Sequence, residues 1–377
     1  MDWTIWLEWA IKSLVLIFTL LIGFGYLTYY ERRFLARIQS RLGPNRAGPQ
    51  GLMQWMADAV KLIFKEELIP AKAYKLVFIL APIITMVPSI VIAAVIPWGP
   101  NVNLFGRDIS QSIANINVGV LFLMSIASIA VYGIVLAGWS SNNKYAMMGG
   151  LRSSAQMISY ELTLGLSMVV AILLGNSMSL VEIVEAQKDG WFILIQPVGV
   201  IIFWIATVAE VTRHPFDMPE AEQEIVAGYH TEYSGMKFAL FFMAEYQKMI
   251  VVSAILATLF LGGYREFAFM QNTWFSVDQN PWLGPFYMLA KIFVLLGIMI
   301  WVRASWPRIK YDRLMSFGWK VLLPLSLAVV FITAIGIILW EESNPFLYKI
   351  ITPILSLLAG WFASLMVDRM IRRKNYA

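Results

Sequence analysis

The sequence predicts an all-α, polytopic transmembrane helical protein, and three observations support this prediction. The chain of 377 residues is 59% hydrophobic and only 14% charged, and its mean hydropathy is +0.67. Soluble domains average about 25% charged residues, so this composition is typical of a chain embedded in lipid. Apolar segments recur along the whole sequence and leave no stretch of soluble composition. We therefore expect a single integral-membrane domain over residues 1–377.

Nine segments are long and apolar enough to cross a bilayer, because a helix needs roughly 20 apolar residues to span about 30 Å of hydrocarbon. They lie at about residues 8–30, 76–97, 118–137, 155–174, 191–209, 238–261, 286–306, 321–340 and 350–367. The first segment follows Asp2 instead of a basic patch and lacks a small-residue cleavage site. We expect a retained helix there and not a signal peptide.

The distribution of Lys and Arg predicts the orientation, because cytoplasmic loops hold the excess of positive charge. Three segments are rich in these residues: 31–75, 303–320 and 369–374. The loops on the other side hold few of them: Arg107, Lys188, Arg265 and Lys349. With nine spans, the N-terminus is expected outside and the C-terminus inside. The same asymmetry explains most of the net charge of +5, so the charge does not indicate a nucleic-acid partner.

Residue counts exclude several kinds of metal and redox centre on this chain. There is no Cys and there are two His, which removes disulfides, Cys-ligated iron–sulfur clusters and the usual zinc sites. Both histidines, His214 and His230, lie in one polar stretch. Haem with axial ligands inside the bilayer is therefore disfavoured.

Residues 51–67 form an amphipathic segment that we expect to lie along the cytoplasmic membrane interface. Its apolar residues share one helical stripe: Leu52, Met53, Met56, Val60, Ile63 and Phe64. Its polar residues lie opposite: Gln54, Asp58, Lys61 and Lys65. The segment is too charged to span the bilayer and too apolar to be free in water, and Pro70 is expected to end it. Two roles stay open, a simple anchor or a wall of a passage for a lipid-soluble molecule.

An acidic loop over about residues 210–235 is unusual for the cytoplasmic side, where positive residues normally gather. Its acids are Glu210, Asp217, Glu220, Glu222, Glu224 and Glu232. Pro215 and Pro219 interrupt any helix, and Glu220 and Glu224 are one helical turn apart. Shielding from water would raise the pKa of at least one of these carboxyls and create a proton store. The alternative is a fully solvated acidic loop.

Ionisable residues also occur inside the apolar segments, where they are costly and usually mark a polar path, a partner or a cavity. They are Glu161, Glu245, Lys248 and Lys291. Glu245 and Lys248 have a spacing of three, so a local ion pair between them is the simpler explanation for these two.

Several motifs identify a family resemblance. The first is Glu31-Arg32-Arg33-x-x-Ala36-Arg37-x-Gln39, followed by Gly43-Pro44-Asn45-Arg46-x-Gly48-Pro49 and Ala57-Asp58-Ala59-x-Lys61-Leu62. The second is Glu210-x-x-Arg213-x-Pro215-Phe216-Asp217-x-Pro219-Glu220-Ala221-Glu222-x-Glu224, continuing to Glu232-Tyr233-Ser234. Shorter matches are Gly149-Gly150-Leu151-Arg152-Ser153, Ser159-Tyr160-Glu161 and Pro307-Arg308-x-x-Tyr311-Asp312. The chain resembles the quinone-site membrane subunit of bacterial respiratory complex I, its H subunit, over nearly its whole length.

The resemblance implies a membrane subunit of an NADH:quinone oxidoreductase that forms the tunnel by which quinone enters from the bilayer. It implies quinone as substrate, with flavin and iron–sulfur clusters on partner subunits, in the bacterial inner membrane. The expected partners are peripheral quinone-site and iron–sulfur subunits, small membrane subunits and antiporter-like membrane subunits. Carried over by position, the quinone path is bordered by Arg32, Arg37, Asp58, Arg213, Phe216 and Asp217. The proton-active line comprises Glu161, Glu210, Glu220, Glu222, Glu224, Glu232 and Glu245.

Two positions depart from the family pattern inside the acidic motif. The family commonly has Asn where this chain has Thr212, and a small residue where it has His214. We expect no loss of activity from Thr212, because a neutral polar group is kept, whereas His214 adds a titratable group beside the path. Two other functions stay open: a membrane subunit of an energy-converting hydrogenase-type complex without quinone, and a stand-alone ion or solute carrier.

Overall fold

A computed structural model describes residues 3–104, 107–218, 227–267, 270–271, 273–341 and 345–375. In this part of the chain, eight helical segments are long and apolar enough to cross a membrane. They are α1 (Trp3–Ile38), α3 (Lys75–Ala93), α4 (Gly119–Ser140), α5 (Lys144–Gly175), α10 (Gly235–Phe260), α11 (Leu283–Ser305), the run through α12 (Tyr311–Phe317) and α13 (Leu323–Gly336), and α14 (Pro345–Asn375). The prediction of an all-α polytopic membrane protein is confirmed. The orientation of the termini stays a prediction.

The fifth predicted span differs from the others because its helix is interrupted. Over residues 191–209 the structure has one turn, α7 (Phe192–Ile195), followed by the 14-residue α8 (Pro197–Glu210). Gln196 between them is not helical, and Pro197 has no amide hydrogen to continue the helical hydrogen bonding. At 1.5 Å per residue α8 is about 21 Å long, shorter than a hydrocarbon core of about 30 Å. In place of nine full spans, the described chain therefore has eight and a short helix.

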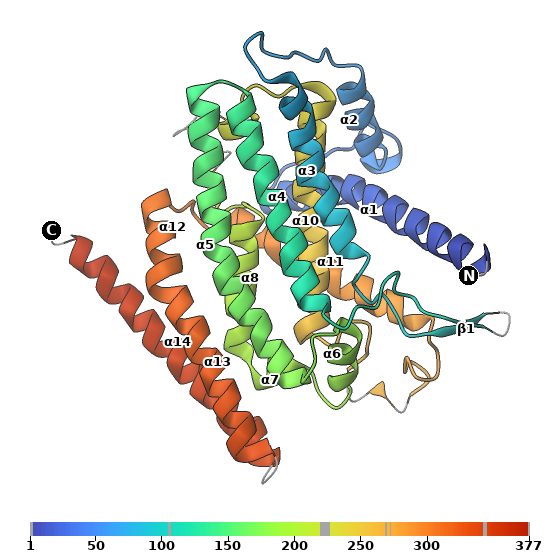
Figure 1. Cartoon of the computed structure of the whole chain (residues 1–377), viewed down its shortest axis with the longest axis vertical. Coiled ribbons are helices and arrows are strands. Elements are labelled where there is room, and N and C mark those ends of the chain that lie inside the picture. Colours follow the sequence, from blue (N-terminus) through green and yellow to red (C-terminus); the bar gives the residue numbers. More distant parts are fainter. Residues whose placement is uncertain are drawn as a thin grey trace.

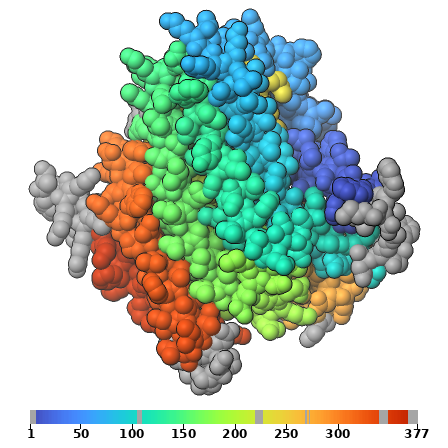
Figure 2. Space-filling model, viewed as in Figure 1, coloured from blue at the N-terminus to red at the C-terminus, as the bar shows by residue number. Residues whose placement is uncertain are grey.

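The helices form a bundle in which α10 is the most buried of the spanning helices, whereas α1 and α14 lie at opposite edges (Figure 1). Figure 2 shows one face of this bundle, where α3, α4, α5 and α13 lie side by side. The short helix α8 packs against α5, α13 and α14 and is buried along most of its length. Protein therefore surrounds the helix that is too short to cross the bilayer by itself.

Smaller elements mark the two ends of the bundle. The interfacial helix α2 (Gln54–Ile63) lies at one end, and α6 (Leu180–Ala186) lies at the other (Figure 1). We call these the α2 end and the α6 end. An antiparallel hairpin of β1 (Val102–Leu104) and β2 (Arg107–Ile109) connects α3 to α4, with Val102 opposite Ile109. The sequence does not predict this hairpin, because three-residue strands are too short for a periodic pattern.

The amphipathic segment forms α2 as predicted, but the helix is shorter than residues 51–67 and ends well before Pro70. Its polar face is turned toward α1: Arg32 donates a hydrogen bond to Asp58 at 2.6 Å, and Trp55 packs on Gly25. The apolar stripe is exposed: Leu52, Met53, Met56, Val60, Ile63 and Phe64. Such an arrangement suits a helix that lies at the membrane interface, with its apolar face available to lipid or to another subunit.

Glycines allow close approach between α3, α4, α5 and the segment before α10. A Cβ atom on Gly133 of α4 would lie 2.2 Å from Thr85 Oγ1 of α3. One on Gly149 of α5 would lie 2.5 Å from the Cα of Gly228. Small residues let membrane helices pack backbone against backbone, which supplies the dispersion contacts that lipid cannot replace. The segment after Ala227 is thereby held directly on α5.

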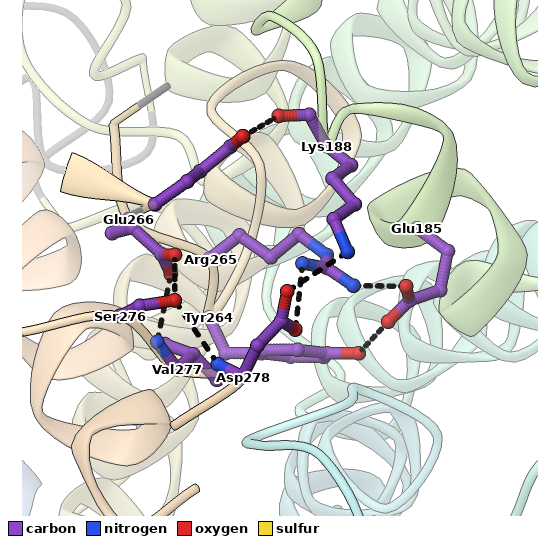
Figure 3. A network of polar contacts seen from close by, with 9 residues as sticks. Glu185, Lys188, Tyr264, Arg265, Glu266, Ser276, Val277 and Asp278 are labelled. Carbon is purple, nitrogen blue, oxygen red and sulfur yellow. Dashed lines mark hydrogen bonds and ion pairs between the residues drawn. The ribbon is translucent and has the colours of Figure 1, made fainter. Parts of the chain in front are cut away.

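An ion-pair network at the α6 end ties α6 to the segment that follows α10 (Figure 3). Arg265 donates to Glu185 and, at 3.4 Å, to Asp278, and the Lys188 ammonium lies 2.8 Å from Asp278. The hydroxyl of Tyr264 donates to Glu185 at 2.6 Å. These contacts fold the segment after α10 back onto the end of the bundle.

Lys291, expected from the sequence to mark a polar path, a partner or a cavity, has backbone carbonyls as its partners. Its ammonium donates to the carbonyls of Leu261, Gly263 and Arg265 at 2.6, 2.7 and 2.6 Å, and lies 4.5 Å from the ring centroid of Trp191. The carbonyls beyond the end of α10 have no helical partners, so an ammonium there satisfies acceptors that burial would otherwise leave unpaired.

Replacing Gly149 with Val should destabilise the chain, because the added side chain would overlap the backbone of Gly228 and Tyr229. We expect a loss of about 1–3 kcal/mol in the free energy of unfolding, measured by thermal unfolding of the full chain in detergent. Gly190 serves as the control, because a methyl group added there would meet no atom within 4 Å and Gly190→Ala should change little. Equal stability of Gly149→Val and wild type would contradict the close approach.

The network at the α6 end predicts that Asp278 contributes to the free energy of unfolding and that this contribution depends on pH. The hydrogen bond from Lys188 lowers the pKa of Asp278 below its usual value, and Arg265 adds to this against the opposing effect of burial. A lowered folded-state pKa stabilises the fold above the unfolded-state pKa of about 4, and this stabilisation is lost as the pH falls through the folded-state pKa.

Asp278→Asn should therefore lower the free energy of unfolding at pH 7 by less than about 1 kcal/mol, since the side chain is half exposed. The difference from wild type should shrink as the pH falls below about 4. Thermal unfolding at several pH values measures both effects, and a difference that grows in acid would refute the assignment.

Candidate functional site

The turn that follows α8 carries the central residues of the acidic motif. Glu210 ends the helix, and Thr212 has a φ of 55°, in the left-handed region that Asn and Gly occupy more readily than a β-branched residue. Gln156 of α5 clamps the turn, because its amide nitrogen donates to the carbonyls of Ala209 and Phe216 at 2.8 Å each. The backbone of residues 209–216 is therefore fixed against α5.

The segment after α11 holds the other side of this turn. The amide of Ile309 donates to the carbonyl of Pro215 at 3.2 Å, and His214 Nε2 lies 2.7 Å from the carbonyl oxygen of Trp306. His214 is one of the two departures from the family pattern. It lies where the turn after α8 contacts the backbone of the segment after α11.

Arg213 lies at the centre of a buried charge network. Its guanidinium donates to Glu31 of α1 and to Glu245 of α10, and also to the Tyr246 hydroxyl at 2.9 Å. Arg303 of α11 donates to the other oxygen of Glu31. Two guanidiniums and two carboxylates give a network without net charge. Such pairing is what allows ionised groups to be buried.

The same network connects three spanning helices and the turn after α8. Tyr246 also places its ring under Arg213, with 4.6 Å from the guanidinium carbon to the ring centroid. Glu31 and Arg213 are almost fully shielded, with side-chain exposures of 3% and 6%. We call Glu31, Arg213, Glu245 and Arg303 the Arg213 network.

Asp217 and Phe216 are buried beside this network. Arg308 donates to the Asp217 carboxylate at 3.0 Å. The Phe216 ring lies 6.1 Å from that of Tyr160, centroid to centroid, and the Tyr160 hydroxyl donates to the carbonyl of Leu314 at 2.9 Å. Both residues, which the resemblance places on the quinone path, are buried inside the bundle, with Phe216 packed against the middle of α5.

Arg32, Asp58 and Arg37 lie on the side where α1 meets α2. Arg32 and Asp58 form the ion pair between these helices, and Lys61 is 3.8 Å from Asp58. Arg37 is exposed in the last turn of α1, where a cation interacts favourably with the helix dipole. The structure therefore divides the residues predicted for the quinone path into two groups, one on the α1–α2 surface and one buried around Arg213.

The residues of the predicted proton-active line are also placed in different surroundings. Glu161 of α5 accepts a hydrogen bond from Ser128 of α4. Glu210 interacts electrostatically with Lys248 and with Glu161. Glu245 forms its ion pair with Arg213 and not with Lys248, so the local pair at spacing three, offered as the simpler explanation, is wrong.

Glu232, in the segment before α10, packs beside the N-terminus of α5. It accepts a hydrogen bond at 2.7 Å from Asn143, whose side-chain oxygen caps α5 by accepting from the amide of Tyr145. The remaining members of the predicted line, Glu220, Glu222 and Glu224, lie outside the described residues, and so does Pro219.

Burial lowers the pKa of His230 to about 3. This histidine packs among the rings of Tyr229, Phe238 and Phe241, so it stays neutral throughout the physiological range. Of the two histidines in the polar stretch, His230 therefore contributes no charge to the candidate site.

The sequence motifs do not place Glu31 and Arg303 in the site. Glu31 stands in them only as the neighbour of Arg32, and Arg303 contributes only to the positive charge between spans. A usable signal is present, because each is a charged residue at the end of an apolar helix and such groups seek a partner of opposite sign. The identity of the partner cannot be read from the sequence, since 182 residues separate Glu31 from Arg213 and 272 separate it from Arg303.

Comparison with known proteins gives clear relatives. A protein-family model described as NADH dehydrogenase matches residues 11–334. One H subunit of the NADH-quinone oxidoreductases of Geobacter metallireducens is 47% identical over 338 residues, which cover 86% of this chain and 94% of that protein. One from Syntrophobacter fumaroxidans is 46% identical over 342 residues, covering 90% and 99%.

The NADH-quinone oxidoreductase H subunit of Thermomicrobium roseum is 46% identical over 345 residues, covering 89% of this chain and 97% of its own length. These relatives confirm the resemblance that the sequence motifs indicate. Because the family match spans most of the sequence and the relatives align over nearly their full length, the chain belongs to the NADH dehydrogenase family.

Proposed function

We propose that this chain is the quinone-site membrane subunit of a proton-translocating NADH-quinone oxidoreductase in a bacterial inner membrane. The observation that carries the proposal is the Arg213 network, a largely buried and charge-balanced set of groups that includes Arg213 of the acidic motif, in a chain of the NADH dehydrogenase family. Relatives that are named as H subunits of NADH-quinone oxidoreductase, 46–47% identical to this chain, support the reaction.

The quinone in this proposal approaches from the bilayer along α1 and α2. The exposed apolar stripe of α2 suits an isoprenoid tail, and the ion pair of Arg32 with Asp58 suits contact with a polar head group. Residues proposed for the path are Arg32, Arg37, Asp58, Arg213, Phe216 and Asp217. Electrons reach the quinone from flavin and iron–sulfur clusters on partner subunits, because this chain has no Cys to hold such clusters.

Reduction of the quinone requires protons to move, because the charge of the added electrons must be balanced. Reduction of a quinone to a quinol takes up two electrons and two protons, so protons must reach the site as electrons do. In the Arg213 network, protonation of Glu31 or Glu245 leaves an unbalanced guanidinium. Two unit charges 4 Å apart interact by about 4 kcal/mol at an effective dielectric constant near 20. A change at the quinone site can therefore shift protons on neighbouring carboxylates.

The proposed proton-active line contains the residues Glu161, Glu210, Glu220, Glu222, Glu224, Glu232 and Glu245. Electrostatic interaction of Glu210 with Glu161, and the position of Glu245 in the Arg213 network, support the first part of this line. The members between residues 219 and 226 are proposed from the sequence motif alone.

Purification of the native complex through a tag on this chain tests the function. We expect flavin and iron–sulfur proteins to co-purify together with quinone, and the preparation to reduce quinone with NADH. A nickel hydrogenase protein in place of the flavin protein would support the energy-converting hydrogenase alternative. A chain that purifies alone and transports ions would overturn the proposal.

Replacing Arg32 with Ala should lower the quinone-dependent rate while electron transfer from NADH to an artificial acceptor stays normal. The Arg32 side chain is 45% exposed, so loss of its ion pair with Asp58 should cost less than about 1 kcal/mol and leave assembly intact. Both rates can be measured on the same purified complex.

Lys61 offers a matched control, because it is a second exposed cation beside Asp58. Lys61→Ala should leave both rates near those of wild type. A parallel fall of the artificial-acceptor rate in Arg32→Ala would assign Arg32 to assembly instead of the quinone path.

A further inference from the structure

A small cavity lies inside the bundle between α3, α4, α5, α8 and α10. Its volume is about 40 Å³, and its wall is mostly apolar, with Leu123, Phe203 and Ile255 among the lining residues. Two ionisable side chains also line it, Glu210 from α8 and Lys248 from α10. One water molecule needs about 10–15 Å³ of such volume, so the cavity has room for about three.

Lys248 and Glu210 share the cavity without touching. Within the described part of the chain, neither side chain forms a hydrogen bond or an ion pair of 4.0 Å or less. Their charges nevertheless interact with one another, and both interact with Glu161. Because both side chains line the same cavity, water in that cavity can contact both of them.

Two other lysines of the bundle contrast with Lys248. The ammonium of Lys237, on the same helix, is held by Glu67. That of Lys291 donates to three backbone carbonyls. Fixed partners of this kind satisfy the hydrogen-bond donors of a buried ammonium. An ammonium in an apolar interior without such partners is costly unless water solvates it or it loses its proton. Lys248 is thus placed to change its protonation state.

The charged and titratable groups around Lys248 come from several elements. Glu245 precedes it by one turn on α10 and belongs to the Arg213 network, Glu210 faces it from α8, and Glu161 interacts from α5. From α3, Ser89 lines the same cavity and donates to the Gln247 side chain at 3.0 Å. Lys248 therefore interacts with one member of the Arg213 network, Glu245, and with two carboxylates outside it.

We propose that Lys248 is a proton-exchanging residue that connects Glu245 and the Arg213 network to Glu210 and Glu161. The inference rests on the proton path of the proposed function and adds a basic residue to it. A proton leaves the Lys248 ammonium and passes through cavity water to the Glu210 carboxylate, so an N–H bond breaks and an O–H bond forms.

The pair changes from ammonium and carboxylate to amine and carboxylic acid, and its net charge stays zero. Moving the proton therefore places no net charge in the apolar interior. Such a charge would be the main free-energy cost of the step. Glu210 next releases its proton toward Glu161, and the Lys248 amine accepts a new proton from the side of Glu245. The pair is then again ammonium and carboxylate, so the cycle can repeat.

Substitution by Arg and by Met tests this exchange in the assembled complex. Arg keeps the positive charge but does not release a proton in proteins, whereas Met has a similar length and no charge. Native complexes carrying Lys248→Arg or Lys248→Met are reconstituted in sealed vesicles. The measurements are the NADH-to-quinone rate with an uncoupler and the number of protons moved per quinone reduced.

We expect both variants to move at least about tenfold fewer protons per quinone than wild type, because an essential proton donor is lost. Lys237→Arg, a buried lysine on the same helix with a fixed partner, should pump as wild type does. A loss smaller than about fivefold in Lys248→Arg would overturn the proposal, since a static cation would then suffice.

If the complex with Lys248→Arg does not assemble, Lys248→Met tests the proposal instead. A loss smaller than about fivefold in protons moved per quinone would then overturn it. A wild-type complex that reduces quinone and moves no protons would instead overturn the proton path of the proposed function, so the two failures are distinguishable.

Discussion

The pairing of Arg213 with Glu31 and Glu245 is the interaction on which the packing of the turn after α8 against α1 and α10 depends. A buried ion pair contributes little net stability compared with apolar packing, but loss of one partner leaves an uncompensated charge that costs about 3–5 kcal/mol. The turn after α8 and the helices α1, α10 and α11 must therefore keep their relative positions for all four charges to be satisfied. This constraint selects one packing of the bundle and places Asp217, held by Arg308, beside the network.

Rigid and adaptable polar groups occupy different parts of the molecule. At the α6 end, Lys291 and Arg265 are held by backbone carbonyls and by carboxylates, and their role is to close the ends of helices. Around Arg213 the charges are balanced pairwise. Between these regions, Lys248 and Glu210 line a cavity instead of contacting each other. Proton transfer needs groups that can exist in two protonation states, and two groups that share a cavity without a direct ion pair suit that requirement.

Exposed apolar surface shows which parts of the chain need lipid or other subunits. The edge helices α1 and α14 bury little of their apolar length within the chain, and α2 exposes its whole apolar stripe. The short helix α8, in contrast, is enclosed by its neighbours. An isolated chain with these surfaces would be unstable in water, because apolar area is left uncovered. Burial in a bilayer and within a larger assembly covers it.

Local properties of the sequence determined the all-α membrane class, the positions of the apolar helices, the interfacial helix and the family motifs, because composition and helical periodicity depend on neighbouring residues. Only the tertiary structure decided which charges meet. Glu245 pairs with Arg213 from the turn after α8 and not with Lys248 one turn away, and Glu31 finds its partners 182 and 272 residues later. Packing likewise decided that the short helix α8, which Pro197 separates from α7, is enclosed by α5, α13 and α14. Such outcomes depend on how helices pack in three dimensions, which no local pattern encodes.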